Sequence, residues 1–280
     1  QMFEDQELAK ELADKGYQFS SANSINIGRL VPQVAYYVYA YTKLLANGEI
    51  KDGEKINVVV PTGNFGNILA AYYAKNLGVP IAKLICASND NKVLYDFFQT
   101  GTYDKNREFV LTTSPSMDIL ISSNLERLIY LICGEDSEKT KKLMEELKTT
   151  GKYTITLEMK EKLADFAAGY STEEETAESI HDTYQKTGYV MDTHTAVAAH
   201  VCGQYRAKSG DQTKCVIAST ASPYKFVKSV MSAIDAENAN ADEFDLLPKL
   251  QEVSGVPMPQ AIKDILDAID RFVYFENRKK

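Results

Sequence analysis

The chain has 280 residues, with 31 Lys and Arg against 39 Asp and Glu, a formal charge of -8 and 44% hydrophobic residues. A chain of this length buries roughly three quarters of its unfolded surface, so it needs neither disulfides nor a metal to form a core. The acidic balance argues against non-specific binding to nucleic acid or anionic lipid, and no apolar run is long enough to span a membrane, so we expect a soluble, cytoplasmic protein.

Short apolar strands alternate with helical segments along the chain. Strands are predicted at 56–60, 81–87, 109–113 and 215–219. Helices are predicted at 6–20, 29–46, 68–77, 93–100, 118–133, 137–149, 158–168, 172–187, 194–208 and 223–235, with a helical tail at 239–280. The alternation predicts an α/β domain with a mainly parallel, doubly covered sheet. We expect residues 1–238 to form a large domain and residues 239–280 a helical extension packed on it.

The cysteines and histidines indicate neither a disulfide frame nor a metal site. The four cysteines are widely separated, lie in apolar stretches and have no C-x-x-C spacing: Cys86, Cys133, Cys202 and Cys215. This is typical of reduced core thiols. His194, His200 and Cys202 lack the i, i+4 spacing that places two ligands on one helix face. We therefore predict no bound metal.

The loop at 61–67 is the most informative local feature. The apolar strand 57–60 runs into P-T-G-N-F-G-N and then directly into a helix. Ligands of parallel sheets bind beyond the carboxyl ends of the strands, and a helix N-terminus offers unpaired N–H groups that suit a phosphate. The loop lacks the Lys-Ser/Thr of a Walker motif and the third glycine of the dinucleotide fingerprint. Its geometry leaves anion binding and a simple tight turn equally open.

Three further segments carry polar residues next to helix starts. Residues 23–29 read N-S-I-N-I-G-R, in which Asn26 or Ser24 caps a helix or, with Arg29, holds an anionic substrate. Residues 192–195 read D-T-H-T, where an ordinary cap is the favoured interpretation. Residues 218–226 read A-S-T-A-S-P-Y-K-F and again follow a strand, so we expect a hydroxyl of this segment at the same sheet edge as the 61–67 loop.

Together these segments resemble one enzyme family. The chain carries, in order, N-S-I-N-x-G-R-L, V-V-V-P-T-G-N-F-G-N-I-L-A, S-P-S-M-D-I-L-I-S-S-N-L-E-R, D-x-H-T-A-V and S-T-A-S-P-x-K-F. This set closely resembles threonine synthase, a pyridoxal-5′-phosphate enzyme of the tryptophan synthase β-like fold type II. The resemblance covers most of residues 15–230 and implies that the predicted domain is the large domain of that fold.

The resemblance implies a cofactor and roles for individual residues. The loop that holds the cofactor phosphate corresponds to Gly63, Asn64, Phe65, Gly66 and Asn67, and Thr220 corresponds to the hydroxyl residue that hydrogen-bonds the pyridine nitrogen. The family converts O-phospho-L-homoserine and water to L-threonine and phosphate by β,γ-elimination and replacement. Its substrate phosphate is assigned here to Asn26 and Arg29, with Ser24 and His194 as weaker candidates. The expected partner is this small-molecule substrate, and the expected oligomeric state is a monomer or a homodimer.

The chain departs from the family in one important respect. The family's Schiff-base lysine lies in an S-F-K-D-like segment upstream of N-S-I-N, and no such segment occurs in this sequence. We expect the chain to be the C-terminal part of a longer enzyme and to be inactive alone. Smaller departures are Ser222 in place of a family His and Thr193 in place of a Pro. Two alternatives stay open: a serine or threonine dehydratase or cysteine synthase of the same fold, and a non-catalytic threonine-synthase-like protein that binds a phosphorylated ligand.

Overall fold

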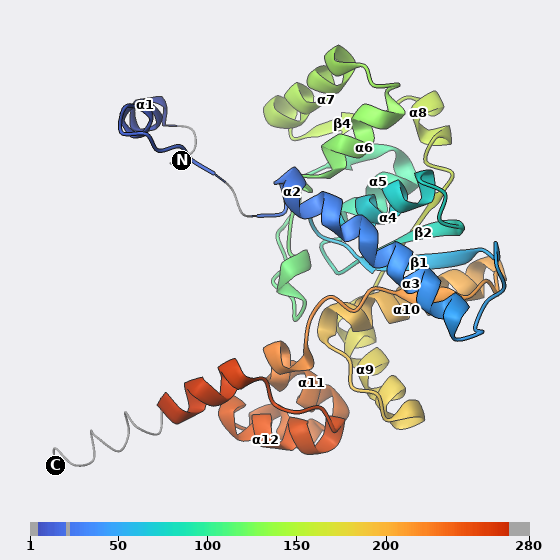
Figure 1. Ribbon diagram of the computed structural model, residues 1–280, viewed down its shortest axis with the longest axis vertical. Helices are drawn as coiled ribbons and strands as arrows, with labels where there is room; N and C mark the ends of the chain where they lie inside the picture. The colour runs from blue at the N-terminus through green and yellow to red at the C-terminus, as the bar shows by residue number, and fades with distance from the viewer. Residues whose placement is uncertain (1–4, 21–22, 269–280) are drawn as a thin grey trace.

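A computed structural model describes residues 5–20 and 23–268 and places a parallel four-stranded sheet at the centre of the molecule (Figure 1). The strands follow the order β5-β2-β1-β6, with bounds β1 (Ile56–Pro61), β2 (Ile81–Ser88), β5 (Phe166–Tyr170) and β6 (Cys215–Ile217). All three pairings are parallel, so the carboxyl ends of the strands meet at one edge. The predicted parallel sheet is confirmed.

Both faces of the sheet are covered by helices, as predicted. Successive side chains of a strand point to opposite faces, and in β1 Val58 and Val60 join a core cluster with α3 (Val34–Ala46), α4 (Gly66–Asn76) and α5 (Val93–Thr100). Val59 points the other way, into a cluster with α10 (Thr193–Ser209). The near-continuous burial of β1 is the reason that it reads as an unbroken apolar run.

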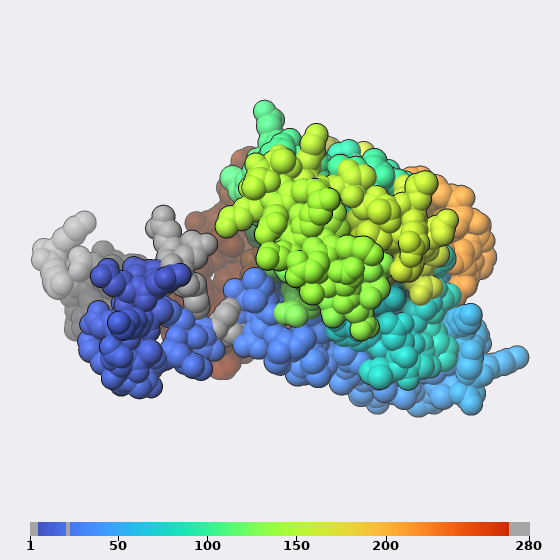
Figure 2. Space-filling model, turned by 90° about the horizontal axis from the view of Figure 1, so that it is seen from above, coloured from blue at the N-terminus to red at the C-terminus, as the bar shows by residue number. Residues whose placement is uncertain are grey.

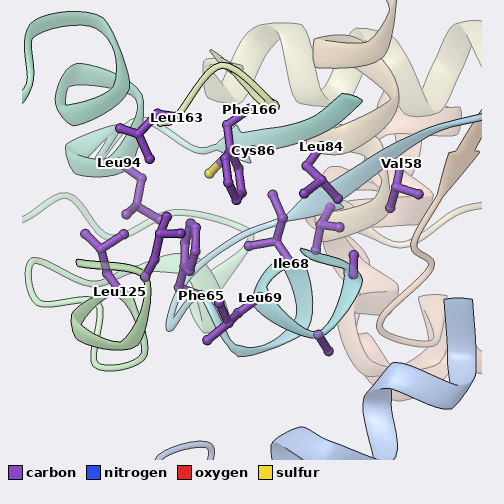
Figure 3. Close-up of a cluster of buried hydrophobic side chains, with 14 of the residues drawn as sticks. Val58, Phe65, Ile68, Leu69, Leu84, Cys86, Leu94, Leu125, Leu163 and Phe166 are labelled. Atoms are coloured by element: carbon purple, nitrogen blue, oxygen red, sulfur yellow. The ribbon is translucent and has the colours of Figure 1, made fainter. Parts of the chain in front are cut away.

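The first core cluster also anchors the loop that follows β1. Figure 3 shows Phe65 among the apolar side chains of this cluster, near Leu69 and Leu125. Its ring centroid lies 6.2 Å from that of Phe98 and 6.0 Å from that of Phe166. Burial of one phenyl side chain contributes about 1.5–3 kcal/mol. The loop is therefore fixed by a side chain that faces the core, and its own residues are buried or half-buried.

The remaining helices form two groups. On the α10 side, α9 (Glu173–Thr187), α11 (Val227–Ile234) and α12 (Glu243–Ser254) share a second core cluster. On the other side lie α6 (Leu125–Ile132), α7 (Ser137–Thr150), α8 (Leu157–Glu161) and the antiparallel pair β3 (Thr102–Asp104) and β4 (Lys152–Thr154). Figure 2 shows this green to yellow-green segment as a lobe above the blue helices. Within the described ranges, no helix is both long and apolar enough to cross a membrane.

The start and the end of the described chain are helical. At the start lie α1 (Gln6–Asp14), α2 (Ile27–Leu30) and a 3-10 turn, η2 (Val31–Gln33). Further 3-10 turns lie later in the chain: η3 (Pro115–Met117), η4 (Pro223–Phe226) and η5 (Ala236–Asn240). A helix at 260–268 follows α12. The predicted helix 29–46 is thus divided by the 3-10 turn, and the rest of the predicted tail, from 269 on, lies outside the described residues.

Two predicted elements are wrong, and two predicted helices are shorter than expected, because α1 ends at Asp14 and α6 begins only at Leu125. Residues 109–113 form no strand: side chains satisfy their backbone, because Val110 N donates to Asn91 Oδ1 (3.0 Å) and Thr112 N to Asp118 Oδ2 (2.9 Å). The predicted helix 158–168 ends at Glu161, and β5 begins five residues later. The centre of β5, Ala-Ala-Gly, lacks the usual strand residues. A Cβ on Gly169 would lie 2.7 Å from Val201, so only a residue this small allows α10 to pack there.

Candidate functional site

A cleft lies at the carboxyl edge of β1 and β6, where the sequence predicts it. Its inner part is a cavity of about 210 Å³, and the site candidates that line it are Ser24, Arg29, Gly63, Asn64, Phe65, Gly66, Asn67, His194 and Thr220. A neighbouring hollow of about 390 Å³ between α3 and β6 is also lined by Asn67 and Thr220. The two hollows are therefore neighbours that share part of their walls. The structure brings together all the sequence candidates except Asn26.

The glycine loop is held by a segment distant in the sequence. A Cβ on Gly63 would lie 2.5 Å from the carbonyl oxygen of Ser116, so this close approach requires glycine. The Ser122 hydroxyl donates to the Gly63 carbonyl (2.8 Å). The backbone N–H and side-chain amide of Asn124 both donate to the Asn64 carbonyl, at 3.1 and 3.0 Å. Two successive loop carbonyls are thereby turned toward the 122–124 segment.

The N–H groups of the same peptides point the opposite way. In a trans peptide the carbonyl and the N–H lie on opposite sides, so the N–H groups of Asn64 and Phe65 are directed away from the 122–124 segment. Phe65 has a left-handed φ of 64°, and α4 begins after it without a side-chain cap. The first turn of a helix has unpaired N–H donors and a partial positive charge. The loop thus has the donor set that an anion such as phosphate requires.

Asn67 is oriented by a buried tyrosine that the sequence motifs did not single out. The Tyr37 hydroxyl of α3 donates to the Asn67 side-chain oxygen. Burial raises the pKa of Tyr37 above its ordinary value, so its hydroxyl keeps the proton that it donates. Because the oxygen of the Asn67 amide is occupied, its NH2 group is the end that faces the remaining space of the cleft.

His194 belongs to a buried network at the start of α10. Asp192 caps this helix, as predicted, because its Oδ1 accepts from the His194 N–H (2.9 Å). The His194 ring accepts at Nε2 from the Ser116 N–H (3.2 Å) and lies 3.2 Å from Asp192 Oδ1 at Nδ1. The Nδ1–H tautomer satisfies both contacts. His194 therefore holds the loop that closes on Gly63.

The network continues to the strand on the other side of the cleft. The Thr195 hydroxyl hydrogen-bonds Asp192 and lies 3.3 Å from the hydroxyl of Ser219, next to Thr220. Burial opposes the charge of Asp192, yet hydrogen bonds from His194 and Thr195 lower the pKa of its carboxyl below the ordinary value. Thr220 itself is exposed at the mouth of the cleft. The D-T-H-T segment is thus both a cap and the link between two walls of the site.

The N-S-I-N-I-G-R segment contributes in two ways. Arg29 and Ser24 line the cleft, whereas Asn26 does not and instead caps α2 through its side-chain oxygen, which accepts from the Gly28 N–H (2.8 Å). Of the two interpretations of Asn26, the structure shows the cap. The Ser24 carbonyl accepts from Asn124 (3.0 Å), which joins this segment to the glycine loop.

A second polar network holds the loop around Ser116 and has no short-range signature in the sequence. The Asn89 amide donates to Thr112 (2.9 Å), Ser114 (3.1 Å) and Asp118 (2.7 Å). Asn89 follows β2, and Asp118 lies almost thirty residues further along the chain. Buried polar networks of this kind specify one loop conformation.

A larger hollow lies elsewhere and does not have the features of an anion site. It measures about 700 Å³ and is lined by α6, α7 and part of α4. Its Arg127 already donates to the Ile25 carbonyl (2.8 Å) and to Asn124 (3.1 Å). The helix N-terminus beside it is capped by Asp136, in contrast to the uncapped start of α4. The chemistry of the smaller cleft is therefore the stronger indication of function.

Comparisons with known proteins agree with the motifs. The family model described as threonine synthase, C-terminal, matches residues 195–279. Human threonine synthase-like 1 is 43% identical over 244 residues, which are 86% of this chain and 32% of that protein. Threonine synthase of Saccharomyces cerevisiae is 38% identical over 255 residues, covering 86% of this chain and 49% of the enzyme.

A solved structure shows that the fold, too, is similar to that of a threonine synthase. The crystal structure of PLP-bound threonine synthase from Brucella melitensis matches with a TM-score of 0.74 and 40% identity, over 83% of this chain and 47% of that one. The resemblance to threonine synthases and the fold type II architecture are confirmed. The chain spans about a third to a half of the length of these three relatives.

Proposed function

We propose that this homologue of the threonine synthases holds the phosphate of pyridoxal 5′-phosphate in the Gly63–Asn67 loop and serves the conversion of O-phospho-L-homoserine and water to L-threonine and phosphate. The observation that carries the proposal is the phosphate cradle, by which we mean the backbone of the Gly63–Asn67 loop and the start of α4. Gly63 has no room for a side chain, two carbonyls of the loop are turned away, and α4 begins without a side-chain cap. These features fit a phosphate group, and the solved Brucella relative is named as PLP-bound.

The residues of the cleft have distinct roles in this proposal. When bound, pyridoxal phosphate supplies an electron sink for the substrate's α-carbon. The loop amides and the Asn67 NH2 would hold its phosphate, and the Thr220 hydroxyl would hydrogen-bond its ring nitrogen. A neutral hydroxyl there does not enforce a charged pyridinium, which suits elimination and replacement chemistry.

The substrate phosphate is assigned to the opposite side of the cleft. Arg29 presents a guanidinium that matches a phosphate with two parallel hydrogen bonds, and Ser24 adds a hydroxyl. Asn26 serves this group by starting the short helix that carries Arg29. His194 acts through its hydrogen bond to Ser116 and keeps the cleft wall in place. A cytoplasmic location and a monomer or homodimer stay predictions.

We further propose that this chain alone does not turn over the substrate. It contains no S-F-K-D-like segment, and its nearest candidates are exposed lysines, Lys225 in η4 and Lys263 in the helix at 260–268. With pyridoxal phosphate added, we expect reversible binding that inorganic phosphate competes away, no specific lysine labelled after borohydride reduction, and no phosphate released from O-phospho-L-homoserine. Phosphate release, or one lysine labelled in full yield, would contradict the proposed inactivity.

A second candidate function is that of a non-catalytic protein that binds a phosphorylated ligand. Both candidates use the same cleft, and they differ in whether the longer protein that contains this sequence carries the lysine. A dehydratase or cysteine synthase, by contrast, has no substrate phosphate and no need for Arg29. An assay of phosphate release by the longer protein separates the first two candidates.

Replacing Arg29 by alanine should weaken binding of O-phospho-L-homoserine by about tenfold or more, because hydrogen bonds to a charged group are worth about 1.5–3 kcal/mol. Titration calorimetry with the chain measures this affinity, and L-homoserine, which lacks the phosphate, should bind equally to both proteins. Lys43→Ala removes the same charge from an exposed site on α3 outside the cleft and should have no effect. Equal affinities of the Arg29 variant and the parent would exclude this phosphate site.

A further inference from the structure

The carbonyl oxygens at the front of the phosphate cradle are engaged within the protein. The Gly63 and Asn64 carbonyls accept hydrogen bonds from the 122–124 segment. The Phe65 carbonyl accepts from the Leu69 N–H of α4 (3.1 Å). A ligand in the cleft therefore meets the N–H groups of this backbone, and the side chains of the loop decide whether the cradle also offers an acceptor.

Two side-chain amides of the loop are each held in one orientation. The Tyr37 hydroxyl donates to the side-chain oxygen of Asn67. The Ser123 hydroxyl donates to the side-chain oxygen of Asn64 (3.4 Å). An amide has an acceptor end and a donor end, and in both asparagines the acceptor end is the one that is used. Both residues line the cleft, and neither NH2 group hydrogen-bonds to the described part of the chain, so these amides can offer donors to a ligand.

A cradle made of donors distinguishes the two ionisation states of a phosphate ester. The dianion has acceptor oxygens alone, whereas the monoanion carries a P–OH group that needs an acceptor of its own. The second pKa of a phosphate ester is about 6, so both forms occur between pH 5 and pH 7. Acceptors elsewhere in the cleft, such as the hydroxyls of Ser24 and Thr220, lie on segments other than the cradle. The cradle itself therefore favours the dianion.

We propose that Tyr37 makes the phosphate cradle selective for fully ionised phosphate, by holding the Asn67 amide with its NH2 group toward the ligand. This selectivity rests on the proposed function of the loop, to which it adds the form of phosphate that binds and the residue that decides it. Tyr37 acts through Asn67 and is therefore a positioning residue. Without the Tyr37 hydroxyl, the Asn67 amide can rotate and offer its oxygen to the P–OH group of the monoanion. Ser123 holds Asn64 in the same way.

Calorimetric titration of the chain with methyl phosphate and with sulfate at pH 5 and pH 7 tests the selectivity. Sulfate is fully ionised at both pH values, so the ratio of the two affinities isolates the effect of the P–OH group. The other charged or titratable side chains along the described walls of the two hollows are Arg29, Tyr36 and His194, and their titration affects both ligands alike. With a pKa of about 6, about a tenth of methyl phosphate is dianion at pH 5, so we expect the phosphate-to-sulfate ratio to fall about tenfold from pH 7 to pH 5.

Three variants assign the selectivity to the amides. In Tyr37→Phe the ratio should fall by less than about threefold, because the released amide oxygen accepts from the monoanion. Tyr41→Phe is the matched control, because this buried hydroxyl one turn further along α3 donates to the Glu54 carbonyl (3.2 Å), outside the cleft. It should keep the full fall of the parent. Ser123→Ala releases the other amide while α3 stays intact, and it should also reduce the fall.

The outcomes separate this selectivity from the phosphate site itself. A parent ratio that does not change with pH would overturn the selectivity, as would a Tyr37→Phe protein that thermal unfolding shows to be folded and that keeps the parent's fall. If Tyr37→Phe does not fold, an unchanged fall in Ser123→Ala overturns it instead. Failure of the parent to bind either ligand at pH 7 would contradict the proposed function, and the selectivity with it.

Discussion

Gly63→Ala should reduce the affinity of the chain for pyridoxal 5′-phosphate and for inorganic phosphate by more than about a hundredfold. The added Cβ would lie 2.5 Å from the Ser116 carbonyl, which is backbone and is itself held through His194, so the glycine loop must move. Each amide that loses its hydrogen bond to a charged phosphate costs about 1.5–3 kcal/mol, and displacement of the loop affects two or more. Fluorescence titration with pyridoxal phosphate and calorimetry with phosphate measure the loss.

Two other glycines provide controls for this substitution. Gly66→Ala brings its Cβ 3.3 Å from the Asn124 amide nitrogen, a far less severe contact than the 2.5 Å at Gly63, so we expect a smaller loss of affinity. Gly203→Ala lies inside α10 with nothing within 4 Å and should stabilise the fold by about 0.5–1 kcal/mol with unchanged phosphate binding. Thermal unfolding of all three variants shows whether the fold is retained. A folded Gly63→Ala protein with full affinity would refute the proposal that the Gly63–Asn67 loop binds the phosphate.

Local patterns in the sequence were sufficient to predict the sheet and one wall of the site. The apolar run of β1, the glycines after it and the Asp-Thr-His-Thr cap report the conformation of neighbouring residues, and these are the elements that the structure confirms. Asp192 shows the limit of this reasoning. Its capping role follows from its position in the sequence, but its link to Ser219 through Thr195 does not.

The parts that the sequence did not predict depend on contacts between distant segments. Asn124 and Ser122 fix the loop carbonyls from about sixty residues away, and no periodicity marks them. Residues 109–113 are β-branched and apolar enough for a strand, but Asn91 and Asp118 satisfy their backbone first. In β5 the reverse holds, because Gly169 is selected by the close approach of Val201 and not by strand propensity. Tertiary contacts override local preference in each case.

Asp192→Asn should destabilise the chain by about 1–3 kcal/mol at neutral pH, because removal of a charged partner leaves buried donors poorly satisfied. Asp192 is 1% exposed and receives hydrogen bonds from His194 and Thr195, which hold its pKa below the ordinary value. A carboxyl whose folded pKa is depressed stabilises the fold above its unfolded pKa, near 3.9, and this contribution is lost as the pH falls through the folded pKa. Urea unfolding of parent and variant at pH 7 and at pH 3 measures the difference.

The pH dependence distinguishes a charge effect from simple loss of packing. We expect the stability gap between the parent and Asp192→Asn to be full at pH 7 and smaller at pH 3, because pH 3 lies below the unfolded pKa near 3.9 and unfolding there takes up a proton. Asp242→Asn makes the same chemical change at the exposed cap of α12, where Asn caps as well as Asp, and should leave stability unchanged. Asp242→Asn should also bind phosphate normally. Asp192→Asn should bind phosphate less tightly, because the His194 ring that holds Ser116 against Gly63 loses its partner. A gap that is equal at both pH values would mean that the charge of Asp192 does not stabilise the fold.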